Sequence, residues 1–476
     1  MTRIAAAFGV TLLLALVLVA CGGGATSPRP PTTPAPSPAA TPSPVATPSP
    51  TAAPAAAEPS TPGSPPASTT TRGEAPPLPD SVRELLKEVA EVRGLEAPPT
   101  LHALTVARRD LFDTYVALVT EEERLQLDET TEVYRLLGHL EENESLWDIQ
   151  ASFLDAVLGF YAPREKTLWV VTDEGGVGLE ELTPSQRETL VHEILHALQD
   201  YHFDLDATFE TLGQNLDAEL AFTAVVEGDA VVHTERHALR SLAIPAAGGR
   251  FFLAAVNQRP NIPAAILREL YFPYTTGATW ARGVVMSGGT EGLDAFLTEP
   301  PPATTLILHP ELMGAGWEPD PPANAGLPEE QLEAVLGPGW QAWFSGSIGE
   351  FHLLNYLVGD APSSPDWLHR STHRPAINAA AGWAGDHYTL FENGDERLLV
   401  ARVRFVDDDE AAQFARHHRS AATRRAEVVE EDGFTLATRS DGNVVGLLEP
   451  VGRDVIFAIG TSAEAVGAAL EALVKG

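Results

Sequence analysis

The spacing of apolar positions separates the chain beyond residue 78 into a helical part and a later part rich in strands. Apolar residues recur every three or four positions over several long segments, which predicts helices with one buried face. These helices are expected at about residues 79–146, 184–200, 216–239, 261–274 and 279–286, with a corner at Phe272-Pro273-Tyr274 joining the last two. A run of β-branched and aromatic residues at 167–172 predicts a strand, either at a sheet edge, where it could pair with a peptide, or inside a core sheet.

From about residue 376 the pattern changes to short alternating segments. Strands are expected at residues 388–392, 397–406, 434–438, 443–448 and 455–459, and Asn393-Gly394 is a hairpin signal. A helix should follow Asp407, because acidic residues suit a helix N-terminus, and residues 463–474 should form a closing helix. The expected fold class is α+β: a mostly helical domain with a small edge sheet at residues 78–375, then a small antiparallel α+β domain at residues 376–476.

The first 77 residues follow a different pattern. Residues 4–20 form an apolar run after a basic start, too short for a membrane span, which indicates a signal peptide over residues 1–20. Leu18-Val19-Ala20-Cys21 resembles the lipobox of bacterial lipoproteins, which implies lipidation of Cys21; an uncleaved membrane anchor is the alternative. Residues 21–77 are almost wholly Pro, Ala, Thr, Ser and Gly, which predicts a disordered stalk. The remainder is therefore expected outside the cytoplasm, tethered to a membrane through a lipid anchor.

Charge and cysteine content narrow the possible partners. The net charge of −35 argues against nucleic acid or an anionic lipid surface as a partner, and a solvated acidic surface explains it. Cys21 is the only cysteine, so its lipidation leaves no disulfide. Stability must then come from packing and from a bound metal.

The clearest chemical signal is the sequence from His192 to His196. Two histidines four residues apart lie one turn apart on one helix face, so both imidazoles can bind one metal ion, and Glu193 points toward a metal-bound water. The helix is expected to begin directly after Thr183, whose hydroxyl can form a capping box with Gln186. This arrangement is typical of a zinc hydrolase.

A zinc site that keeps a water needs a third protein ligand, and in one large group of peptidases a glutamate on a neighbouring helix supplies it. Glu227, in the helix expected at 216–239, is our choice, because Gly228 directly after it lets two helices approach closely. Glu219 and Asp229 are rivals for this role.

Other polar residues near these motifs have both a structural and a chemical interpretation. Asp229, His233 and His237 form a stripe at four-residue spacing that could bind metal, although such a stripe is more often a solvated face. Donation of a hydrogen bond to an oxyanion, or contact with the substrate, has three candidates. These candidates are His309, His202 and Tyr274.

The phrase from Leu190 to Asp200, together with Glu227-Gly228-Asp229-Ala230, resembles the gluzincin metallopeptidases of the thermolysin type. The chain looks most like a group of bacterial HExxH lipoproteins, and the similarity covers roughly residues 80–400. In that group, short phrases like those found here surround the metal helix. These phrases are Gly159-Phe160-Tyr161, Phe272-Pro273-Tyr274 with Gly277, and Leu308-His309-Pro310.

This resemblance implies a zincin-like catalytic domain in which His192, His196 and Glu227 bind Zn²⁺ and Glu193 is the general base. The sequence departs from thermolysin itself in two respects: the gap from His196 to the glutamate is longer, and position 231 is Val rather than an aspartate. Which residue orients the ligand histidines therefore stays open.

The function expected from these observations is zinc-dependent hydrolysis of a peptide or protein substrate by a membrane-tethered metalloendopeptidase-like enzyme. Zinc would lower the pKa of its water, and Glu193 would take the proton and pass it to the leaving amine. One alternative is a catalytically inactive lipoprotein of the same fold that binds cell-envelope components. Another is an envelope interaction protein whose C-terminal sheet carries the function.

Overall fold

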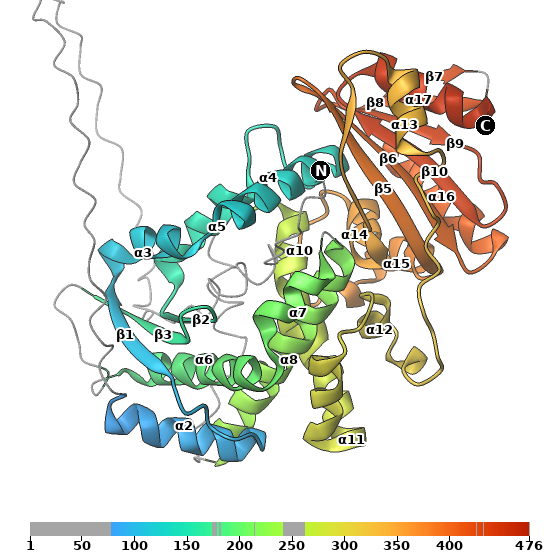
Figure 1. Cartoon of the computed structure of the whole chain (residues 1–476). Helices are drawn as coiled ribbons and strands as arrows, with labels where there is room; N and C mark the ends of the chain where they lie inside the picture. The colour runs from blue at the N-terminus through green and yellow to red at the C-terminus, as the bar shows by residue number, and fades with distance from the viewer. Residues whose placement is uncertain are drawn as a thin grey trace, which may run out of the picture. The chain divides into compact units, whose positions relative to one another are not determined.

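The computed structural model describes residues 78–173, 179, 182–213, 215–240, 262–424, 426–431 and 433–475 (Figure 1). The expected signal peptide, the lipidated Cys21 and the stalk at 21–77 lie outside the described residues. Within the described ranges, no helix is long and apolar enough to cross a membrane. The residues from 77 to 476 belong to one compact unit, and the boundary expected between residues 375 and 376 stays a prediction.

The first part of the unit contains helices with one strand among them. The helices are α2 (Asp80–Arg93), α3 (Leu111–Leu118), α4 (Glu121–Leu137) and α5 (Leu146–Phe153). The prediction of helix throughout residues 79–146 is wrong at β1 (His102–Ala107), a strand that ends in the short sequence Thr105-Val106-Ala107. Its two buried residues, Ala103 and Val106, lie three positions apart, so they match the spacing of a helix and not the alternation of a strand.

Three strands form a small mixed sheet in the order β1-β3-β2. The strand β3 (Thr167–Thr172) pairs in parallel with β1 and antiparallel with β2 (Gly159–Ala162). The expected strand at 167–172 is therefore present, but as the central strand with both sides paired. The outer strands of this sheet are β1 and β2.

Two long buried helices follow the sheet. The helix α6 (Pro184–Phe203) begins with the expected capping box between Thr183 and Gln186, and is followed by α7 (Leu205–Leu212). The helix α8 (Leu216–Arg240) spans the residues expected for the second long helix. Both helices are buried on several sides, since α6 contacts α2, β2 and α8, and α8 contacts α11 and α14. The metal motif thus lies inside the packed core rather than on a surface helix.

The segment after residue 263 is helical from Ala264 to Thr298, with a kink at Gly289, whose φ of 70° and ψ of −170° are not helical. Here α10 (Ala264–Phe272) continues through a π-helical turn at Pro273–Gly277 into α11 (Ala278–Thr298). The prediction of a corner at Phe272-Pro273-Tyr274 is wrong. Pro273 has no N–H to give the helical ladder, and the chain accommodates it by widening one turn instead of breaking the helix.

A seven-stranded antiparallel sheet occupies the C-terminal region, in the order β4-β5-β6-β10-β9-β8-β7. Its strands are β4 (Gln341–Gly346), β5 (Trp383–Asn393), β6 (Glu396–Phe405), β7 (Glu427–Glu431), β8 (Phe434–Thr438), β9 (Val444–Leu448) and β10 (Asp454–Gly460). The expected strands and the hairpin at Asn393-Gly394 are confirmed, whereas β4 and β7 were not predicted. The α+β fold class is therefore confirmed.

Helices cover both faces of this sheet (Figure 1). Those of the region are α12 (Thr305–Leu308), α13 (Glu329–Leu336), α14 (Gly349–Val358), α15 (Arg374–Ala380), α16 (Asp408–Ala422) and α17 (Ala463–Lys475). Alternate residues of β6 pack on opposite faces, so Val403 lies in the same core as Phe414 of α16, and Val400 lies in the core that contains Val466 of α17. The expected helices after Asp407 and at 463–474 are confirmed.

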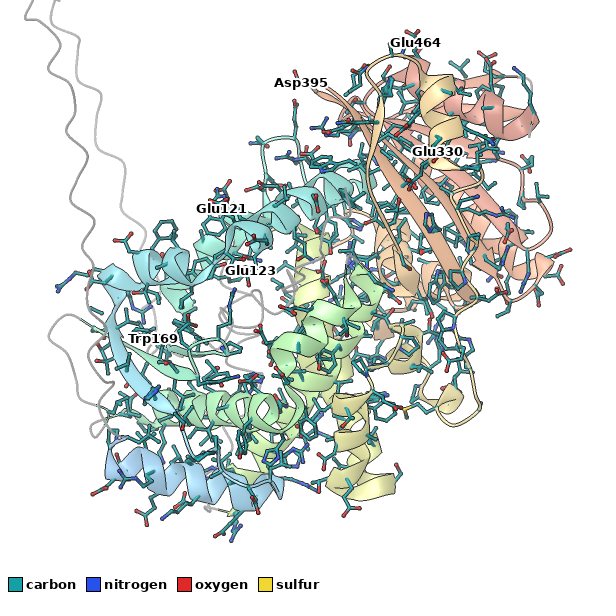
Figure 2. All side chains as sticks on the ribbon, in the orientation of Figure 1. Glu121, Glu123, Trp169, Glu330, Asp395 and Glu464 are labelled. Carbon is teal, nitrogen blue, oxygen red and sulfur yellow. The ribbon has the colours of Figure 1, made fainter. Side chains whose placement is uncertain are left out.

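Acidic side chains on the outside of the unit account for much of its negative charge. Figure 2 labels several that are exposed and belong to α4, α13, the β5–β6 turn and α17. These are Glu121, Glu330, Asp395 and Glu464. Buried acidic residues, by contrast, are mostly paired: Glu123 of α4 accepts a hydrogen bond from Arg164 at 2.6 Å.

Candidate metal centre

Three side chains from α6 and α8 converge in the interior. His192 and His196 lie one turn apart on α6, and Glu227 lies on α8. The Nε2 atom of His192 is 3.1 Å from Glu227 Oε2, and that of His196 is 3.6 Å from Glu227 Oε1. One possible ligand atom from each residue lies within 4.8 Å of the other two, and among the described residues no other group of three His, Cys, Asp or Glu side chains does so.

The spacing of these three donors fits a zinc ion. Ligand atoms placed tetrahedrally at about 2.1 Å from zinc are about 3.4 Å from one another. Each histidine Nε2 lies near this distance from one oxygen of Glu227, His192 from Oε2 and His196 from Oε1, so small side-chain adjustments would let one cation contact all three residues. Two imidazoles and one carboxylate are a donor set that catalytic zinc sites use, with a further position left for water. The residues present therefore fit the ion implied by the sequence.

The charges of the three side chains are strongly coupled. Burial opposes ionisation of Glu227, but the charge of His196 and the hydrogen bond from His192 outweigh it and lower the pKa of Glu227 to about 2. Burial also disfavours the charged form of His196, yet the charge of Glu227 raises the pKa of His196 to about 9. Burial lowers the pKa of His192. The negative charge of Glu227 thus stabilises a proton on the neighbouring histidine. A metal cation bound by the three residues would take the place of this proton.

Glu193 lies beside the three donors and is held by the sheet. Its Oε2 accepts a hydrogen bond from the backbone N–H of Tyr161 in β2 at 2.8 Å. Its Oε1 is buried and has no hydrogen-bond partner among the described residues. Burial is the largest cause that raises the pKa of Glu193 to about 8, and the negative charge of Glu227 raises it further. One oxygen is therefore fixed, and the other is available to a proton of a bound molecule.

A hydrogen-bond chain orients the ligand His196. The Nδ1 atom of His196 lies 2.9 Å from Gln199 Oε1, which fixes this imidazole with Nε2 turned to the metal position. The amide of Gln199 is itself fixed, because Nε2 donates to Asp229 Oδ2 and to the carbonyl oxygen of Val226, each at 2.9 Å. Arg93 of α2 donates from Nε to the same Asp229 oxygen at 2.9 Å. Gln199 and Asp229 thus occupy the orienting role that the sequence left open.

The rival ligands have other partners. Glu219 is buried and accepts a hydrogen bond from Gln126 at 3.0 Å, and it does not belong to the group of three donors. Asp229 belongs to the orienting chain, and His233 Nδ1 lies 2.7 Å from Asp229 Oδ1. The interpretation of Asp229, His233 and His237 as a solvated face is wrong, because all three are buried.

Tyr274 is the candidate that the structure brings to the metal donors. It lies on the π-helical turn, with its ring centroid 6.5 Å from that of His192. Burial, followed by the charge of Glu227 and a hydrogen bond to it, raises the pKa of the Tyr274 phenol well above its usual value. The phenol therefore stays neutral and can donate a hydrogen bond.

Two glycines bring the helix of Tyr274 against α8. A Cβ on Gly228 would lie 2.6 Å from the carbonyl oxygen of Gly277, and a Cβ on Gly277 would lie 2.5 Å from the carbonyl oxygen of Ala224. We expected Gly228 to permit a close helix approach, and it does. The helix that approaches is the one carrying Tyr274, not α6.

The two remaining candidates lie elsewhere in the fold. His202 is exposed near the end of α6, and its Nε2 lies 2.8 Å from the carbonyl oxygen of Glu96. His309 follows α12, with its Nε2 2.7 Å from Glu350 Oε1. Neither is among the residues that contact the three donors in the described part of the chain. Sequence reasoning also missed Arg93, Gln199 and the N–H of Tyr161; only Gln199, three residues after His196, carried a signal that spacing could have used.

Comparison with known proteins adds information on the C-terminal region only. A family model described as "Domain of unknown function (DUF8575)" matches residues 341–470, which run from β4 into α17. No curated protein matches the chain, and no solved structure matches it. The matched residues lie after all three metal donors, so this match carries no chemistry for the site.

Proposed function

We propose that this chain is a zinc-dependent hydrolase, a metalloendopeptidase-like enzyme that acts on peptide or protein substrates outside the cytoplasm and is tethered to a membrane through Cys21. The single observation that carries the proposal is the buried convergence of His192, His196 and Glu227 beside an unpartnered oxygen of Glu193. A purely structural metal site does not require a buried carboxylate with one unpaired oxygen, whereas hydrolysis requires a general base at that position.

Each residue has a distinct role in the proposed reaction. His192, His196 and Glu227 would hold Zn²⁺, and the ion would act as a Lewis acid on water and on the substrate carbonyl. Glu193 accepts a proton at Oε1 from the attacking water and later gives it to the leaving amine, while the N–H of Tyr161 holds Oε2 in place.

Tyr274 and β2 are suited to bind the substrate. The neutral phenol of Tyr274 can donate to the oxyanion that develops on the substrate carbonyl, because it lies against both Glu227 and the ring of His192. The edge of β2 that β3 leaves unpaired can contact an extended peptide, and the N–H of Tyr161 on that edge already binds Glu193 Oε2. The N–H that binds Glu193 comes from this strand, so a peptide aligned on β2 would be brought beside the base.

The arrangement also supports a zincin-like core for this part of the chain. Its elements are the three-stranded sheet, with an antiparallel outer strand next to the metal helix, and a second helix that supplies the glutamate. The seven-stranded sheet has no comparable group of metal donors among its described residues, so a supporting or substrate-positioning role is proposed for it.

The test measures zinc content and cleavage of unfolded casein by the full-length chain and three variants. Wild type and Glu193→Gln should each hold about one zinc, and Glu193→Gln should lose about 10²- to 10⁴-fold in kcat. Glu227→Gln should lose the zinc, whereas Glu219→Gln, a matched change of a buried glutamate on the same helix, should keep it.

Three outcomes would contradict different parts of the proposal. Zinc retained by Glu227→Gln and lost by Glu219→Gln would show that the ligand set is wrong. Equal cleavage by wild type and Glu193→Gln would remove Glu193 as the base. A wild type that holds zinc and cleaves no peptide would favour the inactive, envelope-binding alternative.

A further inference from the structure

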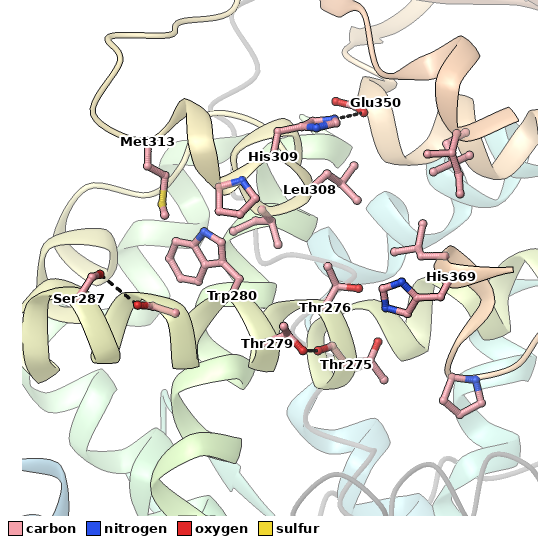
Figure 3. Close-up of a pocket in the computed structure, with 17 residues that line it drawn as sticks. Thr275, Thr276, Thr279, Trp280, Ser287, Leu308, His309, Met313, Glu350 and His369 are labelled. Atoms are coloured by element: carbon pink, nitrogen blue, oxygen red, sulfur yellow. Dashed lines mark hydrogen bonds and ion pairs between the residues drawn. The ribbon is translucent and has the colours of Figure 1, made fainter. Parts of the chain in front are cut away.

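A separate cavity lies between α11, α12, α14 and the segment that leads into α15 (Figure 3). Its volume is about 540 Å³, within the range of pockets that bind small molecules. Figure 3 shows Thr276 of the π-helical turn and Thr279 and Trp280 of α11 on one side, and Leu308 and His309 on the other. None of the three metal donors lines it.

The helix that carries Tyr274 separates this cavity from α8. Gly277 packs against α8, where an added Cβ would lie 2.5 Å from the Ala224 carbonyl oxygen. Thr275 and Thr279, two residues before and after Gly277, line the cavity. Residues two positions apart point about 200° apart around a helix, so the cavity lies on the far side of this helix from α8. It is a second site, not an extension of the metal centre.

The cavity has a buried floor and an accessible mouth. Trp280, Ile307 and Leu354 are buried and form an apolar floor. Thr279 and Gly283 line the cavity but are exposed, so solvent reaches it along this side of α11. An apolar small molecule can therefore enter and remove apolar surface of the floor from water.

One donor in the floor lacks an acceptor. Trp280 is 4% exposed, and its Nε1 has no hydrogen-bond partner within the described ranges. An indole N–H can only donate, and a buried donor left unpaired destabilises the structure. An acceptor oxygen on a bound molecule would satisfy it.

The charges that line the cavity cancel. His309 Nε2 lies 2.7 Å from Glu350 Oε1, so the two residues form an ion pair of zero net charge. The hydrogen bond with Glu350 raises the pKa of His309, and Glu311 lies 3.7 Å from His309 Nδ1 on its other side. The other titratable residue of the lining is His369, which is exposed. Any positive charge on His309 therefore lies beside carboxylates, so this residue gives an anionic ligand little attraction.

We propose that this cavity binds an uncharged, largely apolar small molecule whose carbonyl oxygen accepts a hydrogen bond from Trp280 Nε1. The apolar floor favours the body of the ligand, the indole N–H selects a carbonyl acceptor, and the balanced His309–Glu350 pair gives no preference for a charge. The proposal is independent of hydrolysis at the metal centre.

The test is fluorescence titration of the full-length chain, without added zinc, with three probes. Nile red is uncharged and has a carbonyl, N-phenyl-1-naphthylamine is uncharged without one, and 8-anilinonaphthalene-1-sulfonate is an anion. Nile red should bind with a Kd of roughly 1–10 µM, and the anion at least about tenfold more weakly. Trp280→Phe keeps an aromatic ring and removes the donor. This variant should raise the Kd of Nile red about fivefold and change the Kd of N-phenyl-1-naphthylamine less than about twofold.

Two glycine variants locate the binding. Gly283 lines the cavity and Gly288 does not, and an added Cβ at either position meets no atom within 4 Å. Gly283→Phe should abolish Nile red binding, and Gly288→Phe should leave it unchanged. Unaltered binding by Gly283→Phe, equal weakening of both uncharged probes by Trp280→Phe, or equal affinity for the anion would each overturn the proposal.

Discussion

Removal of the amide that orients His196 should weaken both zinc binding and the fold, and a matched control can separate the two effects. Gln199 makes three hydrogen bonds of 2.9 Å each, to His196 Nδ1, to Asp229 and to the carbonyl oxygen of Val226. Gln199→Leu removes all three while it keeps a similar volume. At about 0.5–1.5 kcal/mol net for each bond, the free energy of unfolding should fall by about 1.5–4.5 kcal/mol.

The effect on the metal is a separate quantity. Loss of a partner that orients a ligand histidine typically lowers metal affinity 10- to 100-fold, or about 1.4–2.8 kcal/mol. Gln199→Leu leaves all three metal donors in place, so zinc should still bind, with a dissociation constant raised by about that factor. Competition with a chromophoric chelator measures this constant, and thermal unfolding of the same samples measures stability.

Gln126→Leu is the matched control. Gln126 is also a buried glutamine, and its described partner is Glu219, which is not a metal donor. This variant removes one described hydrogen bond, so it should lose about 0.5–1.5 kcal/mol of stability and bind zinc as wild type does. Our reasoning would be refuted by zinc affinity within about twofold of wild type in Gln199→Leu, or by an equal loss of affinity in Gln126→Leu.

Three further predictions concern neighbouring features. Gly228→Ala should lower the unfolding temperature and the activity, because its Cβ would lie 2.6 Å from the Gly277 backbone; Gly283→Ala, whose Cβ meets nothing, should do neither. Tyr274→Phe should keep its zinc, measured by metal analysis, and lose roughly 10²-fold in kcat; an unchanged kcat would exclude the oxyanion role. Burial raises the pKa of Glu219 to about 8 from 4.5, so the folded chain holds this proton more tightly than the unfolded chain. Stability should therefore fall as pH rises through about 8, and less steeply in Glu219→Gln, as urea unfolding at pH 5 and pH 9 would show.

The parts of the fold that the sequence predicted depend on local signals. The start of α6 followed from Thr183 and Gln186, which lie three residues apart and cap one another. The hairpin between β5 and β6 followed from Asn393 and Gly394, because Gly394 adopts a φ of 59° that a turn requires. In both cases the residues that decide the structure are neighbours in the chain.

The strands that were missed depend on distant contacts. All five residues of β7 (Glu427–Glu431) are exposed, and three are glutamates, so the segment carries no apolar alternation. It is a strand because the N–H and C=O groups of β8 offer a partner at the sheet edge. Likewise β3 became central because β1, more than 50 positions earlier in the chain, pairs with its second side.

The same distinction explains which site residues could be inferred. His192, Glu193 and His196 share one helical turn, so their spacing alone predicted their arrangement. Glu227 was harder to infer, because it lies on a second helix. We chose it because Gly228 lets another helix approach closely, and this is correct, although the segment that approaches Gly228 is the π-helical turn and not α6. That turn is what places Tyr274 at the metal centre, and no local pattern marks a widened turn.

The orientation of the site depends on residues still further apart. Arg93 of α2 holds Asp229 of α8 across 136 positions of sequence, and Asp229 holds Gln199, which holds His196 of α6. Each link is buried, so no water can replace a lost partner, and the direction of one imidazole depends on how three helices pack together. A change in α2 that loosened this packing would therefore act on the metal centre, although α2 supplies no ligand. The orientation of His196 thus depends on residues of three helices, and only the tertiary structure reveals which residues these are.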